Sequence, residues 1–391
     1  MRWIWITSVA VFFACQTLGH TPQYRGTTTP NRQPTVLDTP VEFSGWRGAT
    51  TDPTRLDEIR IGLFAPVGGD DPVGTAMYEA AQLAIEEVNA IGGFAGVPLR
   101  LMTRWDDDPW RGGSKQMIKL VYEDSVWAVI GSVSGEATHI AEQVITKAWV
   151  PLLSPASADP TLTFIRIPWM FRLPPDDEAQ AEIIFADGLR EFALTNVGLI
   201  TSTDHDGRIF AEQMLDRLNV AAAPPVFHFQ LPANTIDYDD IVLRGKSFDP
   251  DAVVIRVPPS ETLALLDQMR RNGVTIPVLI PWVPGLRHAD LETHYGNAVF
   301  SVQPFSSFKG SRHSVFVKAY RDRYGHDPTP TGAYTYDAVN LIVRSLNKSG
   351  LNRSKMRDAI VGSSGYEGVS GAIRWDNAGG NKAQPSLVGR P

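Results

Sequence analysis

The sequence VWAVIGSVSGEATHIAEQVITKAWVPLLSP, residues 126–155, decides the fold. Its apolar runs and helical period predict a buried strand at 127–130, a loop of small residues at 131–135, a helix, and a second buried strand that ends at Ser154. Strand, helix and strand together form one βαβ unit, in which the two strands run parallel. Because ligands of open parallel sheets bind outside the carboxyl ends of the strands, we expect a binding site at this loop and at the turn 154–159.

A second unit of the same kind follows at residues 250–281, PDAVVIRVPPSETLALLDQMRRNGVTIPVLIP. The strands are spaced almost identically in the two units, since Val129 precedes Leu152 by 23 residues and Val254 precedes Val278 by 24. Two similar units predict two similar lobes with a cleft between their loops. A small molecule held between the lobes is therefore our working hypothesis.

Strands and helices alternate along the rest of the chain as well. Apolar runs and helical periods predict further strands at 59–64, 97–104, 197–201, 226–231 and 298–304, and helices at 75–93, 114–122, 179–191, 208–218, 314–324 and 335–346. This alternation predicts the α/β class, with parallel sheets and right-handed crossovers.

Length, charge and cysteine content narrow the class of protein. A chain of 391 residues predicts two or three domains. The net charge is −7 and the basic residues form no run, which argues against a nucleic-acid-binding protein, because phosphate contacts need clustered Lys and Arg. With one cysteine, Cys15, the chain has no intrachain disulfide.

The first residues, 1–15, predict a signal peptide. One basic residue precedes the mostly apolar stretch 3–13, which is too short to span a bilayer and is typical of a secretory signal. Ala14 directly before Cys15 resembles the end of a bacterial lipoprotein signal, in which the cysteine is lipidated and becomes the mature N-terminus. Plain secretion and an uncleaved anchor remain alternatives. Residues 16–56, rich in Thr, Pro, Gly and Gln without an apolar period, predict a flexible tether.

Eight segments of the folded body occur in an order that resembles a known family. They are IRIGLFAPV (59–67), YEAAQLAIEEVNAIGGFAGVPL (78–99), AVIGSVSGEAT (128–138), VPLLSPASADPTLT (150–163), DPDAVVI (249–255), FVKAYRDRYGHDP (316–328), YDAVNLI (336–342) and YEGVSGAIRWDNAGG (366–380). With them, the chain from about residue 58 to 384 resembles the type I periplasmic binding proteins of the leucine/isoleucine/valine-binding family, which are extracytoplasmic receptors that feed ABC importers.

This resemblance implies two Rossmann-like lobes with parallel sheets, joined by a hinge of three chain crossings that closes around a ligand. We place the crossings near residues 171–175, 300–304 and 357–366. The first lobe then consists of residues 57–173 plus 305–357, and the second lobe of residues 174–304 plus 358–391.

The resemblance also implies a role. It is that of a solute-binding protein that captures a small polar molecule (an amino acid, an amide or a related compound) and delivers it to the membrane permease of an ABC importer. The expected location is periplasmic or at the cell surface, with the protein anchored to a bacterial membrane through lipidated Cys15. The alternative is an extracytoplasmic sensor of the same fold without a transport role.

The resemblance implies that members binding amino acids meet the ligand carboxylate with a serine and the ammonium with an acidic residue of the other lobe. The turn after the next strand supplies a backbone carbonyl and a threonine, and aromatic residues of two further loops close over the ligand. At the matching positions this sequence has mostly other residues. Gly135 replaces the serine, with Ser134 one residue earlier, Ala156 keeps the carbonyl position, and Ala158 replaces the threonine. The candidate ligand-binding residues are Val73, Ser134, Gly135, Ala156, Ser157, Ala158, Asp206 and Trp282. Trp282 stands near the place of the acidic residue, and Val73 and Asp206 stand at the usual aromatic positions. We therefore expect the ligand not to be a simple branched-chain amino acid held in the family's usual way.

Two interpretations remain open for the start of the helix after the 131–135 loop. Ser134 is either its N-cap, with Glu136 in the first turn, or a ligand contact, and the two roles are compatible. The backbone N–H of Gly135 points along the helix dipole and is suited to receive an anionic or carbonyl oxygen.

Four other side chains carry open alternatives. Ser157 either satisfies local backbone groups or faces the ligand. Asp206 lies either on a surface loop or against the ligand, and Trp282 is either a stacking wall of the site or a packing contact. Arg256 either faces the cleft or forms a salt bridge with a neighbour.

The sequence predicts a binding protein and not an enzyme, with no cofactor and no metal site. The motifs of nucleophilic, zinc-dependent and phosphate-binding enzymes are absent. Asp204, His205 and Asp206 are metal-binding residue types, but three adjacent residues of an extended loop cannot all point at one ion. An α/β hydrolase or transferase is the remaining enzyme alternative.

Overall fold

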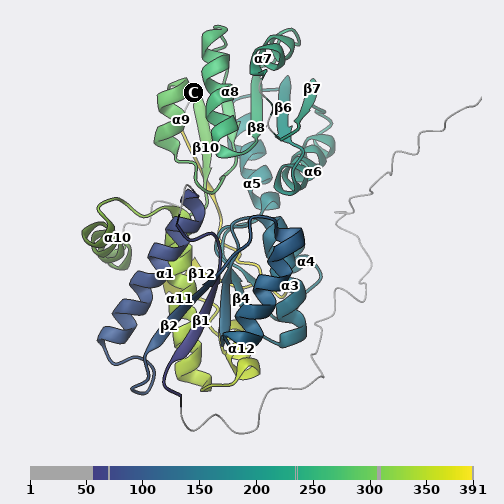
Figure 1. Cartoon of the computed structure of the whole chain (residues 1–391). Helices are drawn as coiled ribbons and strands as arrows, with labels where there is room; N and C mark the ends of the chain where they lie inside the picture. Colours follow the sequence, from purple (N-terminus) through teal and green to yellow (C-terminus); the bar gives the residue numbers. More distant parts are fainter. Residues whose placement is uncertain (1–55, 69–70, 234, 236, 306–309, 390–391) are drawn as a thin grey trace, which may run out of the picture.

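The computed structural model describes residues 56–389 except 69–70, 234, 236 and 306–309. These residues form two α/β lobes, one above the other in Figure 1. The predicted signal peptide, Cys15 and the predicted tether up to residue 55 lie outside the described residues, whereas Leu56, the last residue of that predicted tether, packs against the core of the first lobe. None of the described helices combines the length and the hydrophobicity that a membrane span needs.

The first lobe has a five-stranded parallel sheet of order β2-β1-β3-β4-β5. Its strands are β1 (Ile59–Phe64), β2 (Leu99–Arg104), β3 (Ala128–Gly131), β4 (Leu152–Ser154) and β5 (Met170–Arg172). The βαβ unit expected around residues 126–155 is present, with α3 (Gly135–Ala148) between β3 and β4.

Both faces of this sheet are covered, which explains why β3 is apolar throughout. Ala128 and Ile130 pack into the core under α1, α11 and α12, whereas Val129 packs into the core under α3. Successive side chains of a strand point to opposite faces, so a strand buried on both sides needs apolar residues at every position. The covering elements are α1 (Pro72–Ala90), α2 (Ser114–Ile118), α3, α4 (Thr161–Phe164), α11 (Pro330–Ser349) and α12 (Arg353–Val361), with the π-helical turns η2 (Pro109–Gly113) and η3 (Lys119–Glu123).

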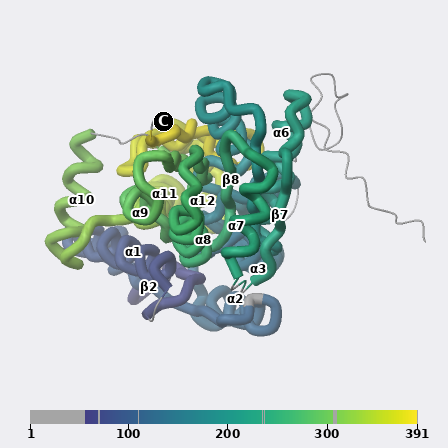
Figure 2. The backbone as a smooth tube through the Cα atoms, turned by 90° about the horizontal axis from the view of Figure 1, so that it is seen from above, coloured from purple at the N-terminus to yellow at the C-terminus, as the bar shows by residue number. Residues whose placement is uncertain are grey.

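Helix α10 (Ser311–Tyr324) stands at the margin of the first lobe, beside α1 in Figures 1 and 2. Phe316 and Tyr320 of α10 form a separate small core with Ala80 and Leu83 of α1.

The second lobe has a six-stranded sheet of order β13-β10-β9-β8-β6-β7, parallel except for β13. Its strands are β6 (Val197–Ser202), β7 (Phe227–Leu231), β8 (Ala252–Arg256), β9 (Val278–Ile280), β10 (Val299–Gln303) and β13 (Ser386–Val388). The elements packed against it are α5 (Asp177–Ile183), η4 (Ile184–Arg190), α6 (His205–Val220), α7 (Tyr238–Lys246), α8 (Pro259–Arg271) and α9 (His288–Tyr295). The second predicted βαβ unit corresponds to β8, α8 and β9.

The chain crosses between the lobes after β5, after β10 and again before β13. The third crossing is therefore later than predicted, and the boundary at residue 358 is wrong. Ile360, Ile373 and Trp375 belong to the core of the first lobe. The hairpin of β11 (Tyr366–Gly368) and β12 (Gly371–Ile373) is tied there as well, because Asp337 of α11 accepts hydrogen bonds from the backbone of the loop between its strands.

The first and last crossings are hydrogen-bonded to each other. The N–H of Arg172 donates to the carbonyl of Gly379 at 2.9 Å, and the N–H of Asn381 donates to the carbonyl of Arg172 at 3.0 Å. The side-chain amide of Asn381 also donates to the carbonyl of Leu173 at 2.8 Å. The Arg172 side chain, 1% exposed, pairs with Asp176 at the start of the second lobe. The two crossings thus form one paired hinge segment.

Candidate functional site

The two lobes meet where the loops at the carboxyl ends of their strands face each other. Gly135 and Asp159 follow β3 and β4 of the first lobe, whereas Asp177, Asp206 and Arg256 lie at the start of α5, the start of α6 and the end of β8 in the second. We call these five residues and their immediate neighbours the interlobe site. The position agrees with the rule that ligands of open parallel sheets bind at strand carboxyl ends.

Ser134 is the N-cap of α3. Its backbone is extended, with φ −147° and ψ 165°, and its hydroxyl accepts the N–H of Ala137 at 3.2 Å. Its carbonyl accepts the hydroxyl of Thr138 at 2.6 Å. The N-cap interpretation is therefore confirmed, because an extended Ser that accepts from the third residue of the helix is the usual N-cap geometry.

Gly135 joins the two lobes through its backbone. Its N–H donates to Oδ1 of Asp206 in the second lobe at 3.0 Å. A Cβ atom at this position would lie 2.6 Å from Oδ1 of Asp206 and 2.9 Å from Oδ2 of Asp159, so only glycine allows the approach. The predicted anion receptor at the start of α3 thus receives a carboxylate oxygen of the protein itself.

Asp206 has a second partner in its own lobe. Its Oδ2 lies 3.8 Å from Nη2 of Arg256, whose side chain is 9% exposed, so the salt-bridge interpretation of Arg256 is confirmed. Burial raises the pKa of Asp206, and the nearby Arg256 partly opposes this. Asp204 caps α6 by accepting the N–H of Gly207 at 2.6 Å, and His205 turns to Asp159. The three adjacent residues 204–206 therefore point to three different partners.

The turn after β4 is tightly packed. Ala156 is 1% exposed and belongs to the first lobe's core, and the hydroxyl of the buried Ser157 accepts the N–H of Asp159 at 3.2 Å. The carbonyl of Ala158 accepts the N–H of Asp177, from the second lobe, at 2.8 Å. Ser157 therefore satisfies a local backbone group, which is one of its two predicted roles, and the carbonyl of Ala158 forms a contact between the lobes.

Asp177 is a buried carboxyl group that the sequence did not single out. Its pKa is held well above the usual range by burial, with Arg256 opposing and Asp206 adding to the shift. The side chain of Gln180 connects Asp177 to the loop after β9, because its Nε2 donates to Asp177 at 3.1 Å and its Oε1 accepts the N–H of Trp282 at 2.6 Å. The interlobe site is therefore rich in carboxyl groups.

Trp282 and Val73 lie where the lobes touch. Trp282 is 4% exposed, packs into the second lobe's core, and meets Tyr334 of the first lobe edge to face at 6.3 Å between ring centroids. Of the two interpretations of Trp282, this geometry corresponds to the packing contact. Val73 is half-buried in the first turn of α1, and its Cγ2 would lie 3.3 Å from a Cβ added to Gly285 of the second lobe.

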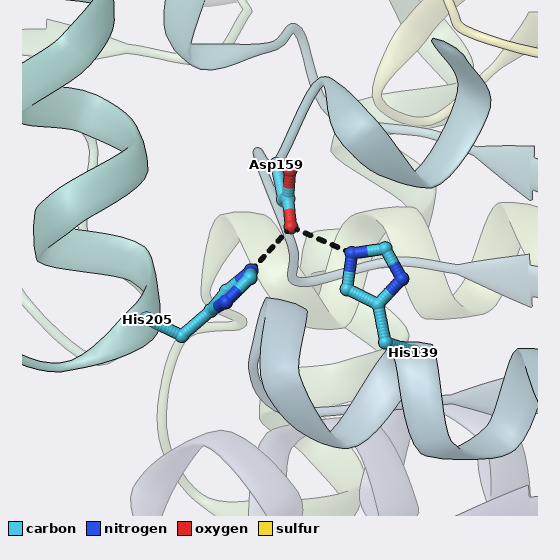
Figure 3. A group of neighbouring side chains, drawn as sticks. All are labelled: His139, Asp159 and His205. Carbon is cyan, nitrogen blue, oxygen red and sulfur yellow. Dashed lines mark hydrogen bonds and ion pairs between the residues drawn. The ribbon is translucent and has the colours of Figure 1, made fainter. Parts of the chain in front are cut away.

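A cluster of His139, Asp159 and His205 also joins the lobes (Figure 3), although His205 was the only one of the three that the sequence analysis considered. Asp159 Oδ2 lies 2.7 Å from Nε2 of His205 and 3.1 Å from Nε2 of His139. Burial lowers the pKa of His139, but hydrogen bonds to Asp159 and Glu142 outweigh it and raise the value to about 9. Burial likewise raises the pKa of Asp159, but both histidines and Thr161 hold it below its usual range. The three residues are 20 and 46 positions apart along the chain, so only the fold brings them together.

The fold is that of a two-lobed α/β protein in which the carboxyl ends of the strands of both lobes meet. The chain belongs to the periplasmic binding protein family, whose model matches residues 58–390. The resemblance inferred from the eight sequence segments is thereby confirmed.

Individual relatives are distant but extend over most of the chain. An amino acid binding protein of Pseudomonas aeruginosa is 22% identical over 85% of this chain and 90% of its own length. A leucine-specific-binding protein of Salmonella typhimurium is 23% identical over the same shares. The branched-chain amino acid transporter substrate binding protein LivJ of Streptococcus pneumoniae, solved with isoleucine, is 22% identical with a TM-score of 0.74, over 85% of this chain and 99% of that one. An ABC transporter substrate-binding protein of Desulfitobacterium hafniense, solved with Leu, is 25% identical with a TM-score of 0.73, over 85% and 98%.

Proposed function

We propose that this protein is an extracytoplasmic solute-binding protein that captures a small polar molecule between its lobes and delivers it to the permease of an ABC importer. Its family and the names of its relatives support this role. The observation that carries it is the hydrogen bond from the Gly135 N–H to Asp206, which joins the lobes at the carboxyl ends of their strands. Opening and closing at this point would admit and retain a solute, as in other two-lobed binding proteins.

The solute differs from that of the relatives named for leucine. The backbone donor of Gly135 already holds the Asp206 carboxylate, and the Ala158 carbonyl already accepts the Asp177 N–H. An amino-acid carboxylate would have to displace Asp206 and approach Asp159, which already pairs with His139 and His205, and Asp177, beside Arg256. A solute that offers hydrogen-bond donors or positive charge suits this site better, because buried carboxylates need donors or cations.

We further propose that Cys15 is lipidated and that residues 16–56 tether the folded body to the membrane. The short apolar stretch before Cys15 and the absence of an apolar period after it support this arrangement.

A thermal-shift screen followed by calorimetry tests the binding function. The panel consists of amino acids, amides, urea, short peptides, amines and aromatic acids, because a bound ligand raises the unfolding midpoint according to its concentration over Kd. A hit should bind at 1:1 stoichiometry and lose affinity in Arg256→Ala, while Arg271→Ala, on the exposed end of α8, should retain it. A hit that binds both variants equally would place the site elsewhere on the protein.

A further inference from the structure

The His139, Asp159 and His205 cluster brings three metal-ligating side chains from two lobes to one point. His139 lies on α3 and Asp159 on the turn after β4, both in the first lobe, whereas His205 is the first residue of α6 in the second lobe. One ligand atom from each side chain lies within 4.8 Å of the other two. In Figure 3 both imidazole rings turn toward the same carboxylate oxygen.

The distances suit a small tetrahedral cation. Bonds of about 2.0–2.2 Å to nitrogen and oxygen place neighbouring ligand atoms roughly 3.3–3.6 Å apart. Oδ2 of Asp159 is 2.7 Å from Nε2 of His205 and 3.1 Å from Nε2 of His139. The distances from Asp159 to the two histidines therefore have to lengthen by about 0.2–0.9 Å before the three atoms can hold an ion.

The surrounding contacts orient the ligands as they are oriented in metal sites. Nδ1 of His139 is 3.1 Å from Oε2 of Glu142, which leaves Nε2 facing Asp159 at 3.1 Å and the hydroxyl of Thr161 at 2.9 Å. A carboxylate behind a ligating histidine fixes the tautomer and raises its basicity. Oδ1 of Asp159 accepts the N–H of Thr161 at 2.7 Å and its hydroxyl at 2.6 Å, so Oδ2 is left to face the two histidines.

Burial strengthens this interpretation. The side chain of Asp159 is 1% exposed and that of Glu142 is 5% exposed. In the described part of the chain, Oε1 of Glu142 has no hydrogen-bond partner. Two carboxylates placed this deeply need positive charge nearby. Either protonated histidines or a bound cation can supply it, and these two alternatives predict different behaviour toward metal ions.

We propose that His139, Asp159 and His205 bind a divalent transition cation of the zinc class between the lobes. Two imidazoles and one carboxylate favour Zn²⁺, Ni²⁺ or Co²⁺ over Mg²⁺ and Ca²⁺, which prefer all-oxygen ligand sets. Three protein ligands leave a fourth position for water or for an oxygen or nitrogen atom of the solute. The site is complete only when the lobes are together, so the cation stabilises the closed arrangement. The inference deepens the proposed function, but metal binding itself does not depend on transport.

Calorimetry with ZnCl₂ and NiCl₂ on chelator-treated protein tests the site, with MgCl₂ as the contrasting ion. We expect one Zn²⁺ per chain and no Mg²⁺ response. His205→Ala and His139→Ala should each weaken Zn²⁺ binding at least 100-fold. Glu142→Gln should weaken it about 10- to 100-fold, as is usual for the partner behind a metal ligand. His326→Ala is the matched control, because His326 is exposed and remote from the cluster.

Two further measurements separate this site from a surface site and from a folding defect. Zn²⁺ should reduce the radius of gyration in solution scattering for the wild type but not for His205→Ala, since His205 is the second lobe's contribution. Thermal unfolding in chelator should show that the variants remain folded. The proposal is overturned if Zn²⁺ fails to bind the wild type, or binds His205→Ala as tightly, since the cluster is then an ion pair only.

The outcomes for the two proposals are distinguishable. Zn²⁺ is titrated without solute, and the solute screen is run in chelator. Histidine-dependent Zn²⁺ binding without any solute hit would count against the proposed function alone. A solute hit in chelator without Zn²⁺ binding would count against the metal site alone.

Discussion

Gly135→Ala should weaken the contact between the lobes while leaving each lobe folded. The added Cβ would lie 2.6 Å from Oδ1 of Asp206, which is too close, so the carboxylate must move away from the Gly135 N–H. A hydrogen bond to a charged group contributes about 1.5–3 kcal/mol. Since 1.4 kcal/mol corresponds to a factor of ten, the ratio of closed to open molecules should fall about 10- to 150-fold.

Small-angle scattering of the protein without solute measures this shift as an increase in the radius of gyration. Gly332→Ala is the matched control, because Gly332 also lies in the first turn of a helix and a Cβ there meets only ordinary contacts at 3.6–3.7 Å. Both substitutions favour the helix by a similar amount of up to about 1 kcal/mol, so the thermal stability of the lobes should change alike.

Asp206→Asn is a second variant, in which the new side chain has nearly the same size and shape as the old one. It keeps an acceptor for the Gly135 N–H but removes the charge and the ion pair with Arg256, so the opening should be smaller than in Gly135→Ala. An unchanged radius of gyration in Gly135→Ala, or an equal change in Gly332→Ala, would refute the idea that this hydrogen bond holds the lobes together.

Three further predictions concern other parts of the chain. Burial raises the pKa of Asp337 to about 6 despite hydrogen bonds from Ser370 and Val369, so the folded protein holds this proton more tightly than the unfolded chain. The stabilisation that the proton provides is therefore complete below about pH 4 and is lost as the pH rises through 6. Asp337→Asn should therefore flatten the slope of unfolding free energy between pH 4 and 6, by about 3 kcal/mol in total, in urea titrations, and an unchanged slope would contradict the assignment. Cys15→Ala should release the protein from membranes into the soluble fraction, whereas continued membrane association would exclude lipid anchoring at that residue. Leucine, isoleucine and valine should show no micromolar binding in calorimetry, and one positive titration would disprove the expected difference from the branched-chain amino acid receptors.

Most of the fold was predictable because its signals are local. The strand β3 and the helix α3 follow from an apolar run, a capping Ser134 and a helical period, all within residues 126–148. The third crossing was misplaced for the opposite reason. The hairpin β11–β12 has strands of three residues, and its link to the first lobe is the distant Asp337, so no periodicity marks where it belongs.

The interlobe site was only partly predictable. Resemblance to a family identified the loops, and Gly135 and Asp206 were both among the candidates, but nothing in the sequence pairs them across the lobes. Asp177 and His139 look like ordinary residues of helix starts and helix faces, because their significance depends on neighbours from the other lobe. A sequence period reports which face of an element is buried and gives no information about which polar groups meet there.

The paired hinge segment limits how the lobes can move. Two single strands crossing side by side without contact would allow the lobes to twist, bend and slide. Because the backbone of Arg172 bonds to both Gly379 and Asn381, the two crossings act as one ribbon, in which one crossing cannot slide along the other without breaking these hydrogen bonds. The lobes should therefore open along a nearly single path, and the groups that meet across the interlobe site should return to the same register at every closure.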